Sequence, residues 1–184
     1  MPKFLITGDP GVGKSALAKE LARRGYVAYD TDDLPDVTRL EDVAGRPVRW
    51  PKPPLDWSRY AWNWQEAGLR ERLASAETVL VAARTTNQEK YYSWFDSILV
   101  LVADPGTLRQ RLGERRGHRY GRHPAELARI LDGHAARVAR LLSPPHAVAI
   151  DAAQPLKQLA ANVIECAIGD TSKGKVAWTH QGWS

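Results

Sequence analysis

A glycine-rich turn near the start of the chain has the residue types and spacing of a phosphate-binding loop. The turn consists of Gly8, Asp9, Pro10, Gly11, Val12, Gly13, Lys14 and Ser15, and it matches G-x-x-x-x-G-K-[ST] at every fixed position. Glycines allow successive backbone N–H groups to point at phosphate oxygens, and a following helix adds partial positive charge. Lys14 would reach the β- and γ-phosphates, and the Ser15 hydroxyl would bind Mg²⁺. The turn therefore predicts a nucleotide site.

The residues around this turn predict the strand and helix that the motif requires. Lys3–Thr7 begins as a short apolar strand. After the turn, Leu17 and Leu21 lie one helical turn apart, and Gly25 provides a C-terminal stop. Because a chance match would lack this strand–turn–helix context, we interpret the turn as a nucleotide-binding loop.

Three carboxylates follow the next expected strand, Tyr26–Tyr29. Asp30, Asp32 and Asp33 come directly after it, and ligands of open α/β sheets collect at the carboxyl ends of the strands. A carboxylate there can hold Mg²⁺ through water or accept a proton from an attacking hydroxyl. Short Asp-rich stretches are also common in solvated turns, but the neighbouring phosphate loop favours a role in the site.

The other apolar segments predict a parallel sheet flanked by helices. Val79–Ala82 and Ile98–Ala103 are apolar throughout, as expected for strands covered on both faces. Ala147–Ile150 is expected to be a short fifth strand. Helices are expected after Asp104, as an N-cap followed by proline, near Pro124, and over the last periodic segment, from Leu156 to Ala167.

The segment Arg59–Ala76 is predicted to be a helix whose apolar stripe contains Trp62, Leu69 and Leu73. These three residues fall within about 40° of one another on a helical wheel. Trp64 lies about 180° from Leu73, so it is a candidate for ligand contact, because aromatic faces stack on bases and sugars. The preceding stretch, Asp30–Pro54, has no clear period and is expected to be a long functional loop or irregular subdomain.

Composition indicates a single globular domain. The chain has 184 residues, 43% of them hydrophobic, and one cysteine, which excludes an internal disulfide and a structural zinc site. Cys166 is expected to be buried. The longest apolar run is too short to cross a bilayer, and the N-terminal residues lack the pattern of a signal peptide. We therefore expect a cytoplasmic protein without a membrane partner.

Six arginines are concentrated within fourteen residues, namely Arg109, Arg111, Arg115, Arg116, Arg119 and Arg122. They account for much of the net charge of +5. Such a cluster could follow a nucleic-acid backbone or close on the phosphates of a small ligand, and composition does not decide between them.

Taken together, these features resemble the small P-loop kinases of the shikimate kinase and nucleoside monophosphate kinase type. The resemblance extends to about Ile168 and rests on the phosphate loop, the Asp30-Thr31-Asp32 triplet and the arginine segment. It implies a three-layer α/β P-loop NTPase fold, with a five-stranded parallel sheet and helices on both faces. The kinase domain would span residues 1–169, with an acceptor-binding region at about 31–75 and an arginine-rich lid at about 113–124. We expect the polar tail, residues 170–184, to be loosely ordered.

The resemblance also implies an activity, which is transfer of the γ-phosphate of ATP, with Mg²⁺, to a hydroxyl or phosphate of a small-molecule acceptor. In shikimate kinases an Asp-x-Asp sequence pairs a carboxylate associated with magnesium and one that binds the acceptor hydroxyl. At the matching positions, Asp30 takes the first role and Asp32 the second. No carboxylate ends the third strand, so Asp30 or Asp32 must serve the metal.

In these kinases, lid arginines close over the nucleotide. Arg115 and Arg122 are expected to contact it, and Arg119 with Lys14 would neutralise charge on the transferring phosphoryl group. Shikimate kinases have a run of glycines after the third strand, whereas this chain has Ala82–Asn87. A different polar acceptor is therefore expected, and the residues that could bind it are Arg84, Thr85, Asn87 and Trp64.

Two other classes of function remain open, a nucleotide-dependent regulatory ATPase and a nucleic-acid end kinase. The N-K-x-D sequence of GTPases is absent, and an AAA-type motor would need a second subdomain. The basic cluster and the tryptophans motivate the end kinase, but the arginines are concentrated where a lid belongs, which disfavours nucleic acid as a partner. The sequence specifies no oligomeric state.

Overall fold

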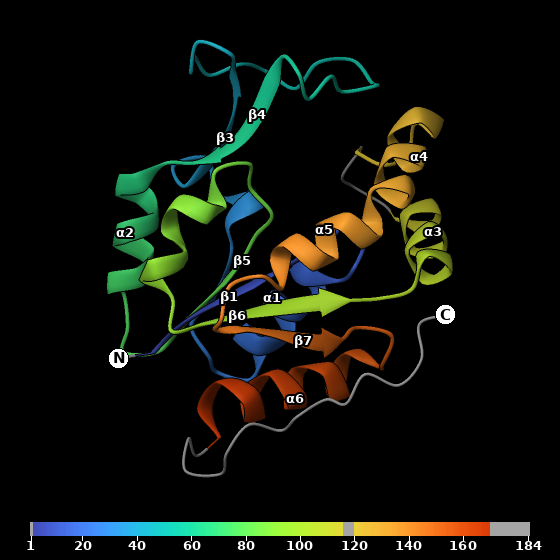
Figure 1. The fold of residues 1–184 in the computed structure, drawn as a ribbon. Coiled ribbons are helices and arrows are strands. Elements are labelled where there is room, and N and C mark those ends of the chain that lie inside the picture. The colour runs from blue at the N-terminus through green and yellow to red at the C-terminus, as the bar shows by residue number, and fades with distance from the viewer. Residues whose placement is uncertain (1, 116–119, 170–184) are drawn as a thin grey trace.

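The computed structural model describes residues 2–115 and 120–169, and a parallel sheet lies at its centre (Figure 1). The strand order is β2-β5-β1-β6-β7, and all four pairings are parallel. The strands are β1 (Lys3–Gly8), β2 (Ala28–Asp30), β5 (Val79–Ala82), β6 (Ser97–Val102) and β7 (Ala147–Asp151). The predicted five-stranded parallel sheet is therefore confirmed, with strand ends within about two residues of those expected.

Helices cover both faces of this sheet, because its strands are apolar on both sides. Leu80 and Ala82 of β5 belong to one core, together with α1 (Lys14–Arg23), α3 (Pro105–Glu114) and α6 (Leu156–Ile168). Val79 and Val81 belong to the other core, together with α2 (Glu66–Ala74), the 3-10 helix η2 (Gln88–Trp94) and α5 (His134–Leu141). Figure 1 shows α6 beneath the sheet and α2 and α5 above it.

Local signals predicted the helix starts well. Asp104 caps α3, since its Oδ1 accepts a hydrogen bond from the backbone N–H of Thr107 at 2.9 Å, and Pro105 occupies the first turn. The single helix expected near Pro124 is divided at Gly133 into α4 (Pro124–Asp132) and α5. The last helix is confirmed as α6. Cys166, on its outer side, is exposed, so the expectation of a buried thiol was wrong.

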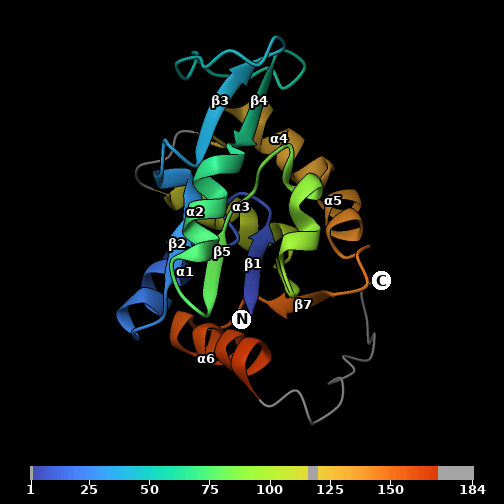
Figure 2. The ribbon, with the colours of Figure 1, turned by 90° about the vertical axis from the view of Figure 1, so that its left-hand side faces the viewer.

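The prediction of a helix over Arg59–Ala76 was wrong in its first half. Residues Tyr60–Trp64 form β4, which pairs antiparallel with β3 (Thr38–Asp42), and only then does α2 begin. Aromatic residues favour strands, and pairing with β3 satisfies the backbone of this segment. The resulting β3–β4 hairpin projects away from the sheet on the side opposite α6 (Figures 1 and 2).

This change of secondary structure exchanges the expected roles of two tryptophans. Trp64 is only 2% exposed and packs on Tyr91 and Phe95 in the core beneath the hairpin. Trp62 is half-buried and lines the large pocket described below. Residues two apart in a strand share one face, so Trp62 and Trp64 lie on the same side of β4 and differ in their position along it, with Trp64 in the core and Trp62 at the pocket. The predicted outward position of Trp64 was therefore wrong.

None of the helices in the described ranges has the length and hydrophobicity needed to cross a lipid bilayer. The tail for which loose order was predicted, residues 170–184, lies outside those ranges.

Candidate functional site

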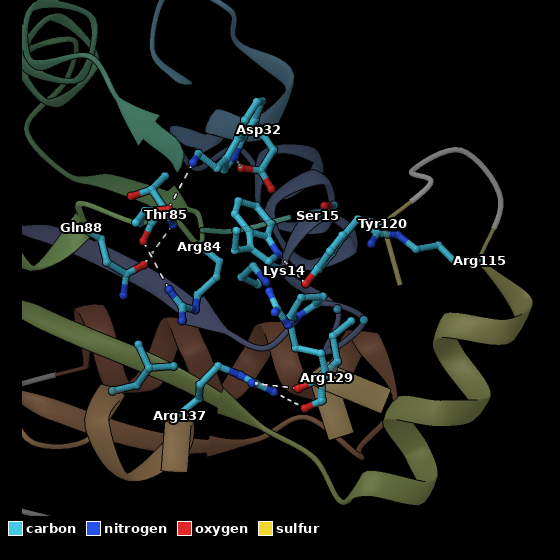
Figure 3. Close-up of a pocket in the computed structure, with 18 of the residues that line it drawn as sticks. Lys14, Ser15, Asp32, Arg84, Thr85, Gln88, Arg115, Tyr120, Arg129 and Arg137 are labelled. Atoms are coloured by element: carbon cyan, nitrogen blue, oxygen red, sulfur yellow. Dashed lines mark hydrogen bonds between the residues drawn. The ribbon is translucent and has the colours of Figure 1, made fainter. Parts of the chain in front are cut away.

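A pocket of about 880 Å³ lies at the carboxyl edge of the sheet, between the phosphate loop, the hairpin and the helices α3 to α5 (Figure 3). Nine residues of the predicted site line this pocket, which are Pro10, Gly11, Gly13, Lys14, Ser15, Asp32, Arg84, Thr85 and Arg115. In Figure 3, Asp32 lies above Lys14 and Arg137 below it, with Thr85 on one side and Tyr120 on the other.

The phosphate loop adopts backbone angles that require glycine. Gly13, which precedes α1, has φ 113°, and Gly8 has φ 145°. A Cβ at Gly8 would lie 2.5 Å from the carbonyl oxygen of Leu101 in β6. Pro10 and Gly11 line the pocket with Gly13, so the loop presents its backbone to a ligand, as a phosphate cradle must.

Two side chains of the predicted loop point into the protein. Val12 belongs to the core. Asp9 is 1% exposed, and its carboxylate is 2.6 Å from His134 Nδ1 and 2.6 Å from Arg137 Nε. Any contact of Asp9 or Val12 with a nucleotide is thus limited to their backbone. The Asp9 carboxylate instead joins the phosphate loop to α5.

Lys14 lies buried at the floor of the pocket. Its Nζ donates hydrogen bonds to the carbonyl oxygens of Gly8, at 2.9 Å, and Asp9, at 3.0 Å. Burial lowers the pKa of Lys14 to about 8, and the nearby cations of Arg84 and Arg115 add to this effect, while Asp32 and Asp9 oppose it. Bound phosphates would place negative charge beside this ammonium group and so favour its protonated form.

Asp30 and Ser15 provide oxygen atoms suited to Mg²⁺. Asp30 Oδ1 accepts a hydrogen bond from the backbone N–H of Asp32 at 3.3 Å, whereas its Oδ2 is buried and has no hydrogen-bond partner among the described residues. Ser15 lines the pocket. The described residues contain no cluster of three or more His, Cys, Asp or Glu that could hold a metal by itself. Mg²⁺ on a nucleotide usually takes one or two protein oxygens plus phosphates and water. Oxygens of these two kinds suit it, but only Ser15 lines the pocket, and Asp30 does not.

Asp32 points into the pocket, and its carboxylate contacts a tryptophan of the hairpin. Trp62 Nε1 donates a hydrogen bond to Asp32 Oδ1 at 2.8 Å. Trp50 packs against the Trp62 ring edge-on, with 5.7 Å between the ring centroids. Trp57 and Tyr120 also line the pocket, and Trp57 Nε1 donates to the hydroxyl of Tyr120 at 2.7 Å. Aromatic side chains therefore form the wall on the hairpin side.

The loop after β5 contributes two of the three predicted acceptor residues. Arg84 and Thr85 line the pocket. Within the described part of the chain, the Arg84 guanidinium donates to the Thr85 carbonyl and forms no ion pair. Burial lowers the pKa of Arg84. The Thr85 hydroxyl is buried and has no hydrogen-bond partner in these described ranges.

Asn87 and Trp64 were predicted to contact the acceptor, and both predictions are wrong. Asn87 Oδ1 accepts a hydrogen bond from Trp64 N at 2.9 Å, and Asn87 Nδ2 donates to Trp64 O at 3.0 Å. The Trp64 indole N–H donates to Thr31 Oγ1. These two residues fasten β4 to the sheet, and neither lines the pocket.

The predicted lid arginines behave differently from one another. Arg115 lines the pocket, and its pKa is lowered by burial against the opposing effect of Asp32 and Asp30. Arg122 is exposed outside the pocket and donates to the carbonyl of Arg115. In this structure Arg122 does not reach the pocket, so its contact with a nucleotide stays a prediction. Arg119 lies outside the described residues.

Sequence reasoning missed three further arginines that line the pocket, Arg129, Arg137 and Arg140 of α4 and α5. Arginines on a helix face are usually solvated, so the sequence held no signal that distinguished them. It also missed Glu126, which is 3% exposed. Its two carboxylate oxygens accept hydrogen bonds from the backbone N–H groups of Leu55 and Gly121, both at 2.9 Å. Glu126, in α4, thus joins the hairpin loop, which is the segment 43–59 between β3 and β4, to the segment before α4.

Comparison with known proteins agrees with this geometry. Residues 5–132 match the model of a family described as an AAA domain. The fold resembles that of a gluconokinase from Sinorhizobium meliloti, with a TM-score of 0.53 and 21% identity over 90% of this chain and 93% of the other. It also resembles a shikimate kinase from Bacteroides thetaiotaomicron, with a TM-score of 0.56 and 19% identity over 90% and 97% of the two chains. These likenesses establish the P-loop fold.

Proposed function

Because the chain belongs to the AAA-domain family of P-loop proteins, we propose that it is an ATP-dependent kinase that phosphorylates a small-molecule hydroxyl or phosphate acceptor. One observation carries this proposal. The pocket does not end at the phosphate loop but continues into a second half lined by Asp32, Trp62 and Arg84. Its volume of about 880 Å³ is near the upper end of the range for small-molecule sites, about 300–1,000 Å³. It therefore has room for a second molecule beside a nucleotide.

On the nucleotide side, the backbone of the phosphate loop would bind the β- and γ-phosphates. The Lys14 ammonium group would stabilise the negative charge of the phosphoryl group during its transfer. Arg111 braces this loop, since its guanidinium donates to the carbonyls of Val12 at 3.0 Å and Ala152 at 2.8 Å. Ser15 and Asp30 would hold Mg²⁺, directly or through water. When bound, the ion would supply positive charge that offsets the negative charge of the phosphates.

On the acceptor side, Asp32 would orient the attacking hydroxyl and accept its proton as the new O–P bond forms and the bond to ADP breaks. The arginines Arg84 and Arg115 would stabilise negative charge on the equatorial oxygens of the phosphoryl group. Little other chemistry is required of the protein, because phosphoryl transfer depends mainly on position and charge.

The names of the two structural neighbours, a gluconokinase and a shikimate kinase, support an acceptor of small size. We therefore propose to measure ADP formation from MgATP with D-gluconate, shikimate, cytidine and cytidine monophosphate, each against a reaction without acceptor. At least one compound class should raise the rate well above background. Normal binding of MgATP with no stimulation by sugar acids, cyclitols, nucleosides or nucleotides would contradict the kinase proposal and favour a regulatory ATPase.

A further inference from the structure

The indole of Trp62 makes a specific polar contact with the carboxylate proposed to handle the acceptor. The distance from Trp62 Nε1 to Asp32 Oδ1 is 2.8 Å, which is short for a neutral donor and typical of a hydrogen bond to a charged acceptor. Asp32 lies in the one-turn helix η1 (Thr31–Asp33) after β2, and Trp62 lies thirty residues later in β4. The contact therefore depends on how the hairpin is placed over the sheet.

The structure fixes the position of Trp62 at three points. Its backbone N–H donates to Thr86 Oγ1 at 3.1 Å, and its carbonyl accepts from the Thr86 N–H at 2.7 Å. Trp50 contacts the ring from the side, at 5.7 Å between centroids. Thr86 belongs to the same loop after β5 that carries Arg84 and Thr85. The donor to Asp32 is thus attached to the pocket wall and not to a solvated strand.

The backbone of Asp32 is held as well, because its N–H donates to Asp30 Oδ1 at 3.3 Å. With the backbone fixed, the remaining freedom of Asp32 is rotation of its side chain. A hydrogen bond to one carboxylate oxygen restricts that rotation. It thereby sets the direction in which the carboxylate meets an acceptor.

We propose that Trp62 is a positioning residue for the transfer reaction, acting through Asp32 by fixing the orientation of its carboxylate. This inference rests on the proposed kinase function. An indole suits the task because it donates one hydrogen bond, carries no charge and cannot accept a proton. A cation at the same place would compete with an acceptor hydroxyl for the carboxylate, whereas a neutral indole occupies only one lone pair of one oxygen. The pocket already has cations nearby in Lys14, Arg84 and Arg115.

The arrangement has a consequence for substrate choice. The ring that orients Asp32 also lines the acceptor half of the pocket, so an acceptor packed against Trp62 is placed relative to the carboxylate by the same side chain. Loss of the indole N–H alone should therefore slow transfer while leaving the nucleotide half unchanged.

The test replaces Trp62 by β-(3-benzothienyl)alanine, introduced through codon suppression, which keeps the bicyclic ring and substitutes sulfur for the N–H. Trp62→Phe serves as a second variant. With the best acceptor of the four named above, kcat should fall about 10- to 100-fold, the range expected for a lost hydrogen bond to a charged group. The KM for MgATP should stay within about twofold. Trp94→Phe is the matched control, because Trp94 lies outside the pocket against Tyr91 and Arg70, and its kcat should not change.

A second readout needs no substrate. The chain has seven tryptophans, and in the protein labelled with nitrogen-15 each gives one indole N–H resonance. Asp32→Ala should shift the resonance of Trp62 more than those of the other six. An isostere variant with unchanged kcat would overturn the inference while the kinase function stood. An equal fall in kcat in Trp94→Phe would overturn it as well. The same holds for a Trp62 indole resonance that does not shift in Asp32→Ala. Absence of acceptor-dependent turnover in the unaltered chain would overturn the kinase function and this inference together.

Discussion

The nucleotide half and the acceptor half of the pocket are built in different ways. The nucleotide half comes from one continuous turn, from Gly8 to Ser15, whose glycine conformations and lysine are specified locally. The acceptor half is assembled from Asp32, Trp62 and Arg84, which lie on three separate segments and meet only when the hairpin packs on the sheet. The first half is a property of the sequence motif, whereas the second is a property of the tertiary structure.

The largest effect is expected from Lys14→Met in the nucleotide half. Removing the buried ammonium should lower kcat/KM for MgATP by about 10²- to 10³-fold, because a preorganised charge at the phosphates is lost. Steady-state kinetics measure this, and Lys19→Met on the exposed side of α1 is the control that should retain activity. If Lys14→Met retained its activity, the claim that the motif residues make the nucleotide half would be contradicted.

Asp32→Asn should affect the acceptor half alone. We expect kcat to fall by about 10²-fold or more, since a positioned proton acceptor is lost, while the Kd for MgATP measured by calorimetry stays within about twofold. Equal losses in nucleotide binding and in turnover would show that the two halves are not separable as described.

Glu126→Ala tests the contact between the hairpin loop and the segment before α4. Two buried backbone N–H groups would lose their acceptor, so the free energy of unfolding should fall by about 2–4 kcal/mol. Glu126→Gln keeps one acceptor oxygen and should cost about half as much. Urea denaturation measures both values. The KM of the acceptor should rise more than the Kd of MgATP, and the reverse order would contradict the placement of this contact.

The pKa of Lys14 predicts how nucleotide binding depends on pH. The pKa is about 8 in the protein without nucleotide, and bound phosphates should raise it, so binding above pH 8 requires proton uptake. The Kd for MgATP should therefore be constant below about pH 8 and rise up to about tenfold per pH unit above it. Calorimetry in buffers of different ionisation enthalpy would detect the proton. A Kd that stays flat from pH 7 to 10 would contradict the lowered pKa.

The smallest effect is expected at Arg122, which the structure places outside the pocket. Arg122→Ala should change kcat/KM by less than about twofold, as for a surface substitution, whereas Arg115→Ala should lower it by about tenfold or more. Measuring both under the same conditions compares two arginines of one segment. A larger loss at Arg122 than at Arg115 would support the nucleotide contact that the sequence predicts for Arg122 and contradict its place outside the pocket.

The parts of the fold that the sequence predicted well are those with local signals. The five strands, the cap at Asp104 and the period of α6 follow from short stretches of chain, as does the loop around Lys14. Asp32 and Arg84 were identified because they follow strands, and the carboxyl edge of a parallel sheet is where such residues gather.

The errors lie where tertiary contacts decide. Trp62 and Trp64 were assigned to different sides of a helix, and only pairing with β3 puts them two residues apart on one face of a strand. Asn87 is polar and follows β5, but both ends of its amide are used by the backbone of Trp64. Arg137 is drawn to the site by the buried carboxylate of Asp9, 128 positions away, a pairing that no sequence period reveals.

The most direct test of the account follows the phosphorus atom of the γ-phosphate. Phosphorus-31 NMR of the protein with MgATP and D-gluconate, shikimate, cytidine or cytidine monophosphate should show ADP and a new phosphorylated product of one of these compounds in equal amounts. Formation of ADP and inorganic phosphate alone, at a rate that no compound of these classes alters, would contradict the claim that the pocket joins a nucleotide and a small-molecule acceptor.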